Sequence, residues 1–228
     1  GIKFREIALL NNAQYSSLRE KSADLALDCS ILIKNEEQLE AWATEFAIHF
    51  KNKTAEYQKI SRGAALNQVA NSINDTDASN NKIEWSLTKL GNVPLAGASA
   101  KEKISYYRSK LIIAERLKNL AEVEKAADGM LSIGSLSKSD REFALSRKAW
   151  ASELTLNFGA AYKITKKMAM PQLSHEEKIL KLAMLAELAG YSPSQHYHQF
   201  LKVTKNKGKA QSVAMKMVRN SSDRRFAF

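Results

Sequence analysis

The chain has 228 residues, of which 44% are hydrophobic and 26% are charged, and such proportions exclude an intrinsically disordered chain and a fibrous protein. Only 9 Gly and 3 Pro interrupt it, so long helices are favoured over a turn-rich β architecture and we expect an all-α fold. The single cysteine, Cys29, excludes an internal disulfide and a thiolate metal cluster within one chain, and no stretch reaches the roughly 18 apolar residues of a membrane-spanning helix.

Four helices are expected in the first third of the chain. Residues 3–10 and 13–33 form the first two. The run Asn35–Gln38 is typical of a capping box, in which the first side chain accepts a hydrogen bond from a free helix N–H and the fourth reaches back. It predicts a third helix, whose apolar stripe extends from Leu39 to Phe50. Thr54 is expected to cap the fourth.

A polar segment over residues 74–81 is predicted to be a loop, because Asn, Asp and Ser bond their own backbone. Its first residues are similar to a calcium-binding EF-hand loop. However, Asn80 stands where that loop needs Gly, and Ser86 where it needs Glu, so no calcium site is predicted. A short helix over 82–90 then leads into a loop with Gly and Pro at residues 91–97.

This loop is the predicted boundary inside the chain. Residues 1–92 are expected to be an irregular helical region or degenerate repeats, and residues 99–228 helical repeats, the two forming one continuous solenoid. The pattern Ser-x-x-Glu begins three helices, at Ser99, Ser139 and Ser174, which lie 40 and 35 residues apart. A helix, a bend and a return helix take about 34–47 residues in known two-helix repeats.

The helix pairs of residues 99–206 resemble the tetratricopeptide repeat. The period is similar, and small residues (Ala126, Ala127, Ala160, Ala161) stand where the second helix of a pair would pack, with Met130 and Ile164 a turn later. The resemblance implies stacked antiparallel helix hairpins forming a right-handed α-solenoid, with a concave groove lined by the first helices. A helical bundle is the alternative architecture.

The net charge of +11 is concentrated in the last third, since residues 161–228 hold 13 Lys and Arg against 4 Asp and Glu. Such a field attracts anionic partners, namely nucleic acid, an acidic protein segment or a phospholipid surface. The alternative is that these lysines only solvate helix surfaces. The predicted basic patch consists of Lys163, Lys166, Lys167, Lys202, Lys205, Lys207, Lys209, Lys216, Arg219, Arg224 and Arg225.

No pattern typical of a catalytic or metal site occurs in the sequence. His196 and His198 are two residues apart, which places them about 200° apart on a helix, and no Glu accompanies them at the spacing of a zinc motif. Gly-rich phosphate loops, Gly-x-Ser-x-Gly elbows and paired-cysteine motifs are absent from it. We therefore predict no enzyme activity, no cofactor and no metal.

The leading prediction is a scaffold or adaptor that binds a protein or peptide partner, through the groove of the first helices and with help from the basic last third. The residues chosen for this role, all on predicted first helices, are Tyr106, Arg108, Lys110, Arg147, Lys148, Lys178 and Lys181. A nucleic-acid-binding repeat protein and the helical, non-catalytic part of a larger enzyme are the alternatives. The sequence leaves the oligomeric state open. It also leaves the compartment open, cytoplasm or periplasm, because a chain without a disulfide is compatible with both and a piece of a longer protein can lack its targeting signal.

Overall fold

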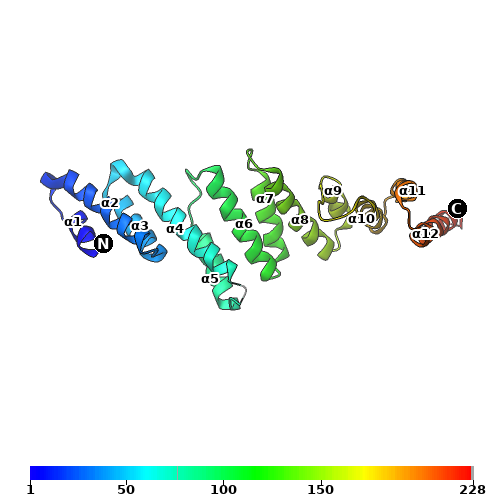
Figure 1. Cartoon of the computed structure of the whole chain (residues 1–228), viewed down its shortest axis with the longest axis horizontal. Helices are drawn as coiled ribbons and strands as arrows, with labels where there is room; N and C mark the ends of the chain where they lie inside the picture. Colours follow the sequence, from blue (N-terminus) through cyan, green and yellow to red (C-terminus); the bar gives the residue numbers. More distant parts are fainter. Residues whose placement is uncertain (76, 227–228) are drawn as a thin grey trace. The chain divides into compact units, whose positions relative to one another are not determined.

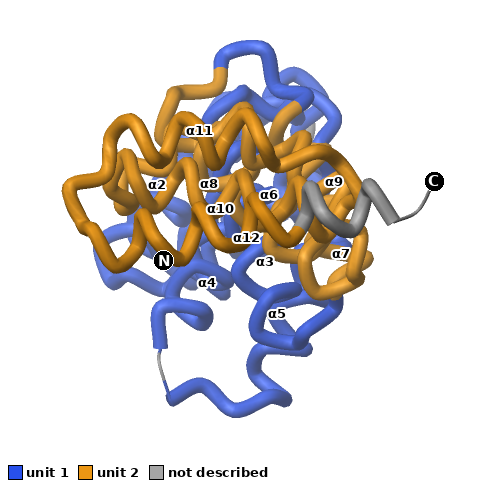
Figure 2. Tube along the Cα trace, turned by 90° about the vertical axis from the view of Figure 1, so that its right-hand side faces the viewer, with its two compact units in different colours: residues 1–119, 132–135 blue, residues 120–131, 136–228 orange. Residues whose placement is uncertain are grey.

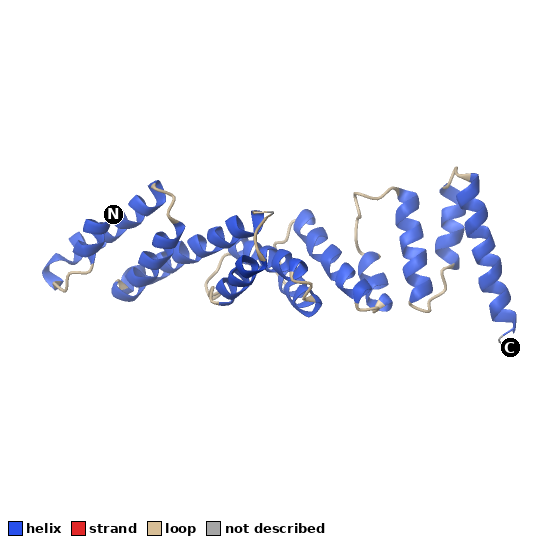
Figure 3. Ribbon diagram, turned by 90° about the horizontal axis from the view of Figure 1, so that it is seen from below, coloured by secondary structure: helices blue, strands red, loops and turns tan. Residues whose placement is uncertain are grey.

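The computed structural model describes residues 1–75 and 77–226, with side chains at all of these positions except 13 and 220–226. Within these ranges the chain forms helices and no strand (Figures 1 and 3), which confirms the predicted all-α class. The α-helices are α1 (Ile2–Ala8), α2 (Ser16–Leu32), α3 (Glu36–His49), α4 (Thr54–Asn74), α5 (Asn80–Gly91), α6 (Ala100–Arg116), α7 (Leu120–Leu131), α8 (Lys138–Leu154), α9 (Phe158–Thr165), α10 (His175–Leu188), α11 (Ser194–Val203) and α12 (Lys207–Phe226).

The chain divides into two compact units, coloured separately in Figure 2. Unit 1 comprises Gly1–Asn119 and Ser132–Ser135, and unit 2 comprises Leu120–Leu131 and Leu136–Phe228. Unit 1 therefore contains α1 to α6, and unit 2 contains α7 to α12. The boundary predicted near residues 92–99, between an irregular helical region and helical repeats, stays a prediction.

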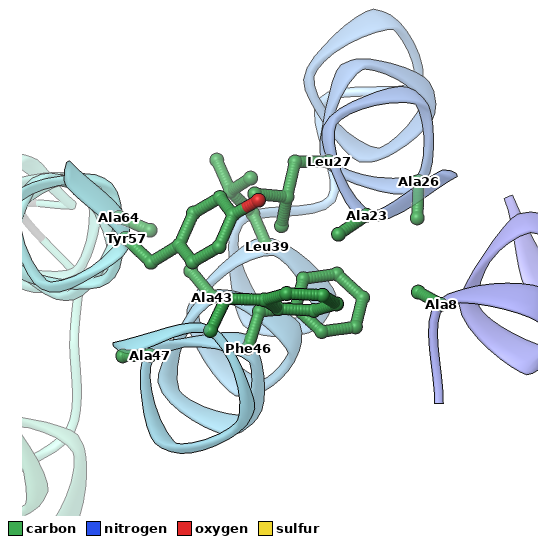
Figure 4. Close-up of a cluster of buried hydrophobic side chains, with 11 residues drawn as sticks. Ala8, Ala23, Ala26, Leu27, Leu39, Ala43, Phe46, Ala47, Tyr57 and Ala64 are labelled. Atoms are coloured by element: carbon green, nitrogen blue, oxygen red, sulfur yellow. The ribbon is translucent and has the colours of Figure 1, made fainter. Parts of the chain in front are cut away.

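The first core of unit 1 joins α1, α2, α3 and α4. Small side chains, among them Ala8, Ala23 and Ala26, let α1 pack closely against α2 and α2 against α3, while the rings of Phe46 and Tyr57 fill the centre (Figure 4). The two ring centroids are 5.9 Å apart, a separation typical of packed aromatic pairs. A second cluster in this unit involves α4, α5 and α6.

In unit 2 each helix packs against the next one along the chain, from α7 to α12. The residues that the sequence marked as small packing positions support this, because Ala126, Ala127 and Ala161 are buried. Ala160 is half-buried. Further buried side chains of this unit are Val123, Met130, Ala144, Leu145, Ala149, Ala151, Ile179, Ala183, Leu185, Ala186, Tyr197, Phe200 and Val213.

The same backbone turn ends α2, α6, α8 and α10. At the end of α8, Leu156 donates its N–H to the Glu153 carbonyl (3.1 Å) and Asn157 donates to the Ser152 carbonyl (2.8 Å). This is the Schellman arrangement, which requires a left-handed residue after the helix. The left-handed residues have φ of 54° at Lys34, 52° at Lys118, 58° at Leu156 and 73° at Gly190.

Two of these turns lead directly into the next helix. Asn35 and Asn157 follow the left-handed residue and cap α3 and α9, because their side chains accept from the N–H of Gln38 and Ala160. An asparagine in this position satisfies a helix N–H that otherwise has no partner. One helix thus ends and the next begins within a few residues, as a helix hairpin requires.

The predicted helix starts are correct at two of the three Ser-x-x-Glu patterns. Ser99 and Ser174 form complete capping boxes with Glu102 and Glu177. The start at Ser139 is wrong: α8 begins at Lys138, and Ser137 is its cap, accepting from the Asp140 N–H at 3.0 Å. The three serine caps are therefore 38 and 37 residues apart, a more even spacing than the sequence predicted.

The capping role predicted for Thr54 is also wrong. Thr54 is the first residue of α4, and the preceding Lys53 occupies the cap position without a side-chain hydrogen bond. The Thr54 hydroxyl instead donates backwards to the Ala47 carbonyl at 2.9 Å. It therefore joins the start of α4 to the end of α3 rather than capping its own helix.

Candidate protein-binding groove

A groove of about 640 Å³ lies in unit 2 beside the first half of α8. One wall is the exposed side of α8 from Lys138 to Arg147, and the other is the segment that follows α9. The lining residues are Lys138, Ser139, Arg141, Glu142, Phe143, Leu145, Ser146, Arg147, Lys167, Ala169, Pro171 and Gln172.

Glu142 fixes the second wall of the groove. Its two carboxylate oxygens accept the backbone N–H groups of Ala169 (2.9 Å) and Met170 (2.6 Å). Met170 is buried and has φ of 46°, a left-handed conformation that a non-glycine residue adopts at a cost. The bidentate hydrogen bond from the carboxylate holds the segment in that conformation and satisfies the Glu142 oxygens.

The residues that line the groove include an arginine stacked on an aromatic ring. The guanidinium carbon of Arg147 lies 3.8 Å from the ring centroid of Phe143, which is a close cation–π contact. Arg147 also donates to the Ser146 hydroxyl at 3.3 Å. Stacking and this hydrogen bond orient the planar guanidinium, and an oriented guanidinium is suited to bidentate recognition of a carboxylate.

The charge of the groove is strongly one-sided. Among the described residues that line it, Lys138, Arg141, Arg147 and Lys167 carry positive charge, and Glu142 is the one carboxylate. Because that carboxylate already accepts two backbone N–H groups, it competes little for the cations. The first turn of α8 adds the partial positive charge of a helix N-terminus. The groove is therefore suited to acidic side chains, with Phe143 offering an apolar contact.

Neither a histidine nor the cysteine is among the residues lining the groove. In the described part of the chain no group of three or more His, Cys, Asp or Glu is arranged to hold a metal ion. No described helix is long and apolar enough to cross a membrane. The charged and aromatic side chains that line the groove are suited to the recognition of charge and shape.

The residues predicted to contact a partner are distributed over both units. Three lie on α6 in unit 1: Tyr106 is buried in the core, Arg108 is exposed, and the ammonium of Lys110 lies 5.8 Å from the Tyr106 ring centroid. In unit 2, Arg147 lines the groove, whereas Lys148 and Lys181 make ion pairs within the fold.

The two ion pairs join α8 to two other helices of unit 2. Lys148 of α8 pairs with Asp128 of α7, and Lys181 of α10 pairs with Glu153 of α8 at 2.9 Å. Lys178 is half-buried on α10. Lys148 and Lys181 are therefore engaged within the fold. Arg147 is the residue of the predicted set in unit 2 that lines the groove, so we regard it as the strongest candidate there.

The described side chains of the basic patch are exposed and are distributed over several elements of unit 2. Lys163, Lys166 and Lys167 lie on or just after α9, Lys202 lies on α11, and Lys205, Lys207, Lys209, Lys216 and Arg219 lie before or on α12, all of them exposed. Of these, Lys167 lines the groove. The side chains of Arg224 and Arg225 lie outside those that the structure describes.

His196 is held in place beside this patch. Its Nε2 lies 2.9 Å from the hydroxyl of Tyr162, and the two rings pack edge to face with centroids 5.8 Å apart. Burial lowers the pKa of His196, and the positive charge of Lys166 lowers it further. The neutral form is therefore favoured, as expected of a packing residue that links α9 to α11.

Sequence reasoning missed Lys138, Arg141 and Phe143. They belong to the first turns of α8, whose start was placed two residues too late. The overlapping pattern Ser137-x-x-Asp140 is the signal that could have corrected that start, because Asp is also a good partner in the first turn of a helix. The correct start would have left Glu142 without a capping role and drawn attention to its surroundings.

A comparison with models of known protein families found no match for this chain. Comparisons with curated proteins and with solved structures found no match either. Function is therefore argued from the residues and their geometry.

Proposed function

We propose that the chain is a non-catalytic helical-repeat scaffold, a right-handed α-solenoid similar to tetratricopeptide repeats, and that it binds an acidic segment of a partner protein. The groove beside α8 is the observation that carries this proposal. It combines four cations, an exposed wall of α8 and an aromatic ring in one site of about 640 Å³. A short acidic peptide with an apolar residue fits this combination.

The recurring helix ends support the repeat architecture. Serine caps at Ser99, Ser137 and Ser174 begin the first helices, and left-handed residues at Lys118, Leu156 and Gly190 end them. The distance from serine cap to left-handed residue is 19 positions in the first two cases and 16 in the third. The caps themselves are 38 and 37 residues apart, and a two-helix repeat takes about 34–47 residues.

The proposed binding mode divides the work between charge and packing. Arg147, oriented by Phe143, pairs with one carboxylate of the peptide, while Arg141 and Lys167 attract others. An apolar side chain of the peptide packs on the exposed part of the Phe143 ring. Rim charges chiefly accelerate association, whereas the stacked Arg147 contributes to the lifetime of the complex.

Fluorescence anisotropy of a labelled peptide tests this function. The probe is a ten-residue peptide of alternating Glu and Leu, compared with a Lys and Leu peptide of the same length. We expect saturable binding of the acidic probe alone. The double variant Arg141→Glu/Lys167→Glu should weaken it at least tenfold, because two attractive charges become repulsive.

The matched control is Lys216→Glu/Arg219→Glu, which makes the same charge change on exposed residues of α12. This control should bind the acidic probe within about twofold of the unmodified chain, since neither residue lines the groove. If both double variants weakened binding equally, the general charge of unit 2 would be responsible and the groove would not be the site.

Nucleic-acid binding is the second candidate, and the exposure of nine basic residues from Lys163 to Arg219 favours it. Exposed lysines and arginines spread over α9, α11 and α12 can contact phosphates without reading sequence. A gel-shift titration with a 30-nucleotide single-stranded RNA at 50 mM salt is the test. In this case Lys216→Glu/Arg219→Glu should weaken binding, and absence of a shift would remove the candidate.

A further inference from the structure

Helix α2 has an exposed leucine stripe on the face turned away from the core. Leu18, Leu25 and Leu32 are 53%, 45% and 80% exposed. They are seven residues apart, so they lie nearly in line along the helix. The buried residues of α2, namely Ser22, Ala23, Ala26, Leu27 and Ser30, lie on the opposite side. The three leucines are therefore not part of the core cluster of unit 1.

Two charged residues complete this stripe. Lys21 and Asp28 are exposed and, at ~100° per residue, fall within the same arc of ~80° as the three leucines. Along the helix the order is Leu, Lys, Leu, Asp, Leu. Its first half carries the positive charge and its second half the negative charge. We define these five residues, Leu18, Lys21, Leu25, Asp28 and Leu32, as the α2 stripe.

The α2 stripe is complementary to itself in one orientation. If a second copy of α2 lies antiparallel with Leu25 opposite Leu25, then Leu18 of each copy meets Leu32 of the other. In the same register Lys21 lies four residues before the centre and Asp28 three residues after it, so opposite charges face each other across the interface. A parallel pair would place Lys21 against Lys21 and Asp28 against Asp28, which is unfavourable.

An apolar pocket extends the stripe at one end. Leu32 borders a pocket of about 570 Å³ that is also lined by Ile2, Phe4, Ile33 and Trp42. In the antiparallel arrangement Leu18 of the second copy lies beside this pocket. The apolar surface thus continues past the helix itself, and contiguous apolar surface of this kind is uncommon on monomers except at interaction sites.

We propose that the α2 stripe is a homodimer interface in which two copies of α2 pack antiparallel about Leu25. A contact centred on one helix of 17 residues, ~25 Å long, is small for a protein interface. The dimer is therefore reversible, and its population rises with protein concentration. Its interface involves unit 1, whereas the groove proposed for partner binding lies in unit 2, so the two proposals stand separately.

Sedimentation velocity over a concentration series tests the dimer. We expect the weight-average sedimentation coefficient to rise from the monomer toward the dimer value. Leu25→Asp should keep the protein monomeric throughout. The matched control is Leu188→Asp on α10, because Leu188 is 51% exposed and lies in unit 2. Circular dichroism establishes that both variants are folded, as expected for changes at exposed positions.

Charge exchange tests the orientation. Lys21→Glu alone and Asp28→Lys alone should each weaken dimerisation, because each places like charges opposite one another. The double variant Lys21→Glu/Asp28→Lys should restore it to within about twofold. Cross-linking is measured in a Cys29→Ser background. Under oxidation, two chains carrying L25C should form a disulfide-linked dimer, and a mixture of L18C and L32C chains should form a disulfide-linked heterodimer. Chains carrying L18C alone should not cross-link.

Three results would overturn the proposal. The first is a protein that remains monomeric at all concentrations. The second is a dimer that Leu25→Asp leaves unchanged or that Leu188→Asp disrupts equally. The third is efficient cross-linking of L18C to itself, which would show a parallel or different interface. Leu25 lies outside the groove beside α8. Binding of the acidic probe to the Leu25→Asp variant therefore tests the proposed function separately from the dimer.

Discussion

A buried ion pair between α4 and α6 provides a sharp test of the fold of unit 1. Arg62 is 5% exposed and Glu102 15% exposed, and the Arg62 Nε donates to a carboxylate oxygen of Glu102 at 2.8 Å. The other oxygen of Glu102 accepts from the N–H of Ser99 at 2.8 Å, as the capping box requires. One carboxylate therefore both begins α6 and ties it to α4.

The pKa of Glu102 gives the magnitude of this stabilisation. Burial alone raises the pKa, but hydrogen bonds from Arg62 and Ser99 outweigh it and hold the pKa at about 2, against an ordinary value of 4.5. This difference corresponds to about 3 kcal/mol. Because the pKa is lower in the folded state, the stabilisation is complete above the unfolded value of 4.5 and is lost as the pH falls toward 2.

Urea denaturation followed by circular dichroism measures this effect. Glu102→Gln should lower the free energy of unfolding by about 3–5 kcal/mol at pH 7, because it leaves the Arg62 guanidinium buried without a counter-ion. At pH 2.5 the difference between the two proteins should shrink strongly, since Glu102 is then protonated in the unfolded chain and the pH is close to its folded pKa of about 2. The double variant Arg62→Met/Glu102→Gln should recover part of the loss.

The exposed pair of Lys82 and Asp75, with side chains 47% and 41% exposed, is the control. Asp75→Asn should leave the urea denaturation midpoint almost unchanged, as expected of a surface ion pair. The reasoning is refuted if Glu102→Gln costs no more than this control, or if its cost is the same at pH 7 and pH 2.5.

Three further predictions concern the helix ends and the groove wall. Leu156→Gly should raise the free energy of unfolding by about 0.5 kcal/mol, because φ is 58° and the side chain is 73% exposed. Gly190→Ala should lower it by about 1 kcal/mol, because φ is 73° at that position. Thermal melts should therefore show a higher melting temperature for the first variant and a lower one for the second. In urea denaturation, Ser137→Ala should lower the free energy of unfolding by about 1 kcal/mol, whereas Ser139→Ala should leave it almost unchanged. The reverse order would mean that α8 begins at Ser139, as the sequence first suggested. Glu142→Gln should lower the free energy of unfolding by about 2 kcal/mol and weaken binding of the acidic probe, because a neutral amide cannot accept both backbone N–H groups as strongly as a carboxylate. Unchanged binding in the anisotropy assay would show that the groove wall held by Glu142 is not needed for binding.

Local signals predicted the helix starts well wherever one local partner was available. Ser99 with Glu102 and Ser174 with Glu177 are boxes without a competitor, and both form. Around residue 139 two overlapping boxes compete, and the distant segment at residues 169–170 takes Glu142 from the second. Ala169 and Met170 follow Glu142 by 27 and 28 positions, and a contact over such a distance leaves no trace in local spacing. The groove beside α8 could therefore not be predicted from the sequence.

The burial of Tyr106 shows a second limit of periodicity. Its position on α6 is compatible with an exposed, partner-facing residue, yet α6 packs against both α4 and α5. A helix with neighbours on two sides buries a wide arc, and Tyr106 packs edge to face against Tyr107 with ring centroids 5.1 Å apart. The apolar positions of α6 can be identified from the sequence alone, but the number of helices that pack against α6 cannot.

The left-handed turns were hidden for a different reason. Gly190 is the residue type that such a turn favours, whereas Lys34, Lys118 and Leu156 carry side chains that disfavour positive φ. What they share is the residue that follows, an asparagine at 35, 119 and 157. A search for a helix-ending residue followed by Asn, rather than for Gly, would have found these three helix ends.

The distribution of charge also separates the two proposed partners by their salt dependence. A peptide in the groove meets at most four lining cations, and ion pairs within the fold already engage Lys148 and Lys181. A nucleic acid that follows the exposed basic residues of α9, α11 and α12 would neutralise more phosphates and release more counterions. Because the logarithm of affinity falls with the logarithm of salt in proportion to the number of phosphates neutralised, the slope for RNA should be clearly steeper than for the acidic probe.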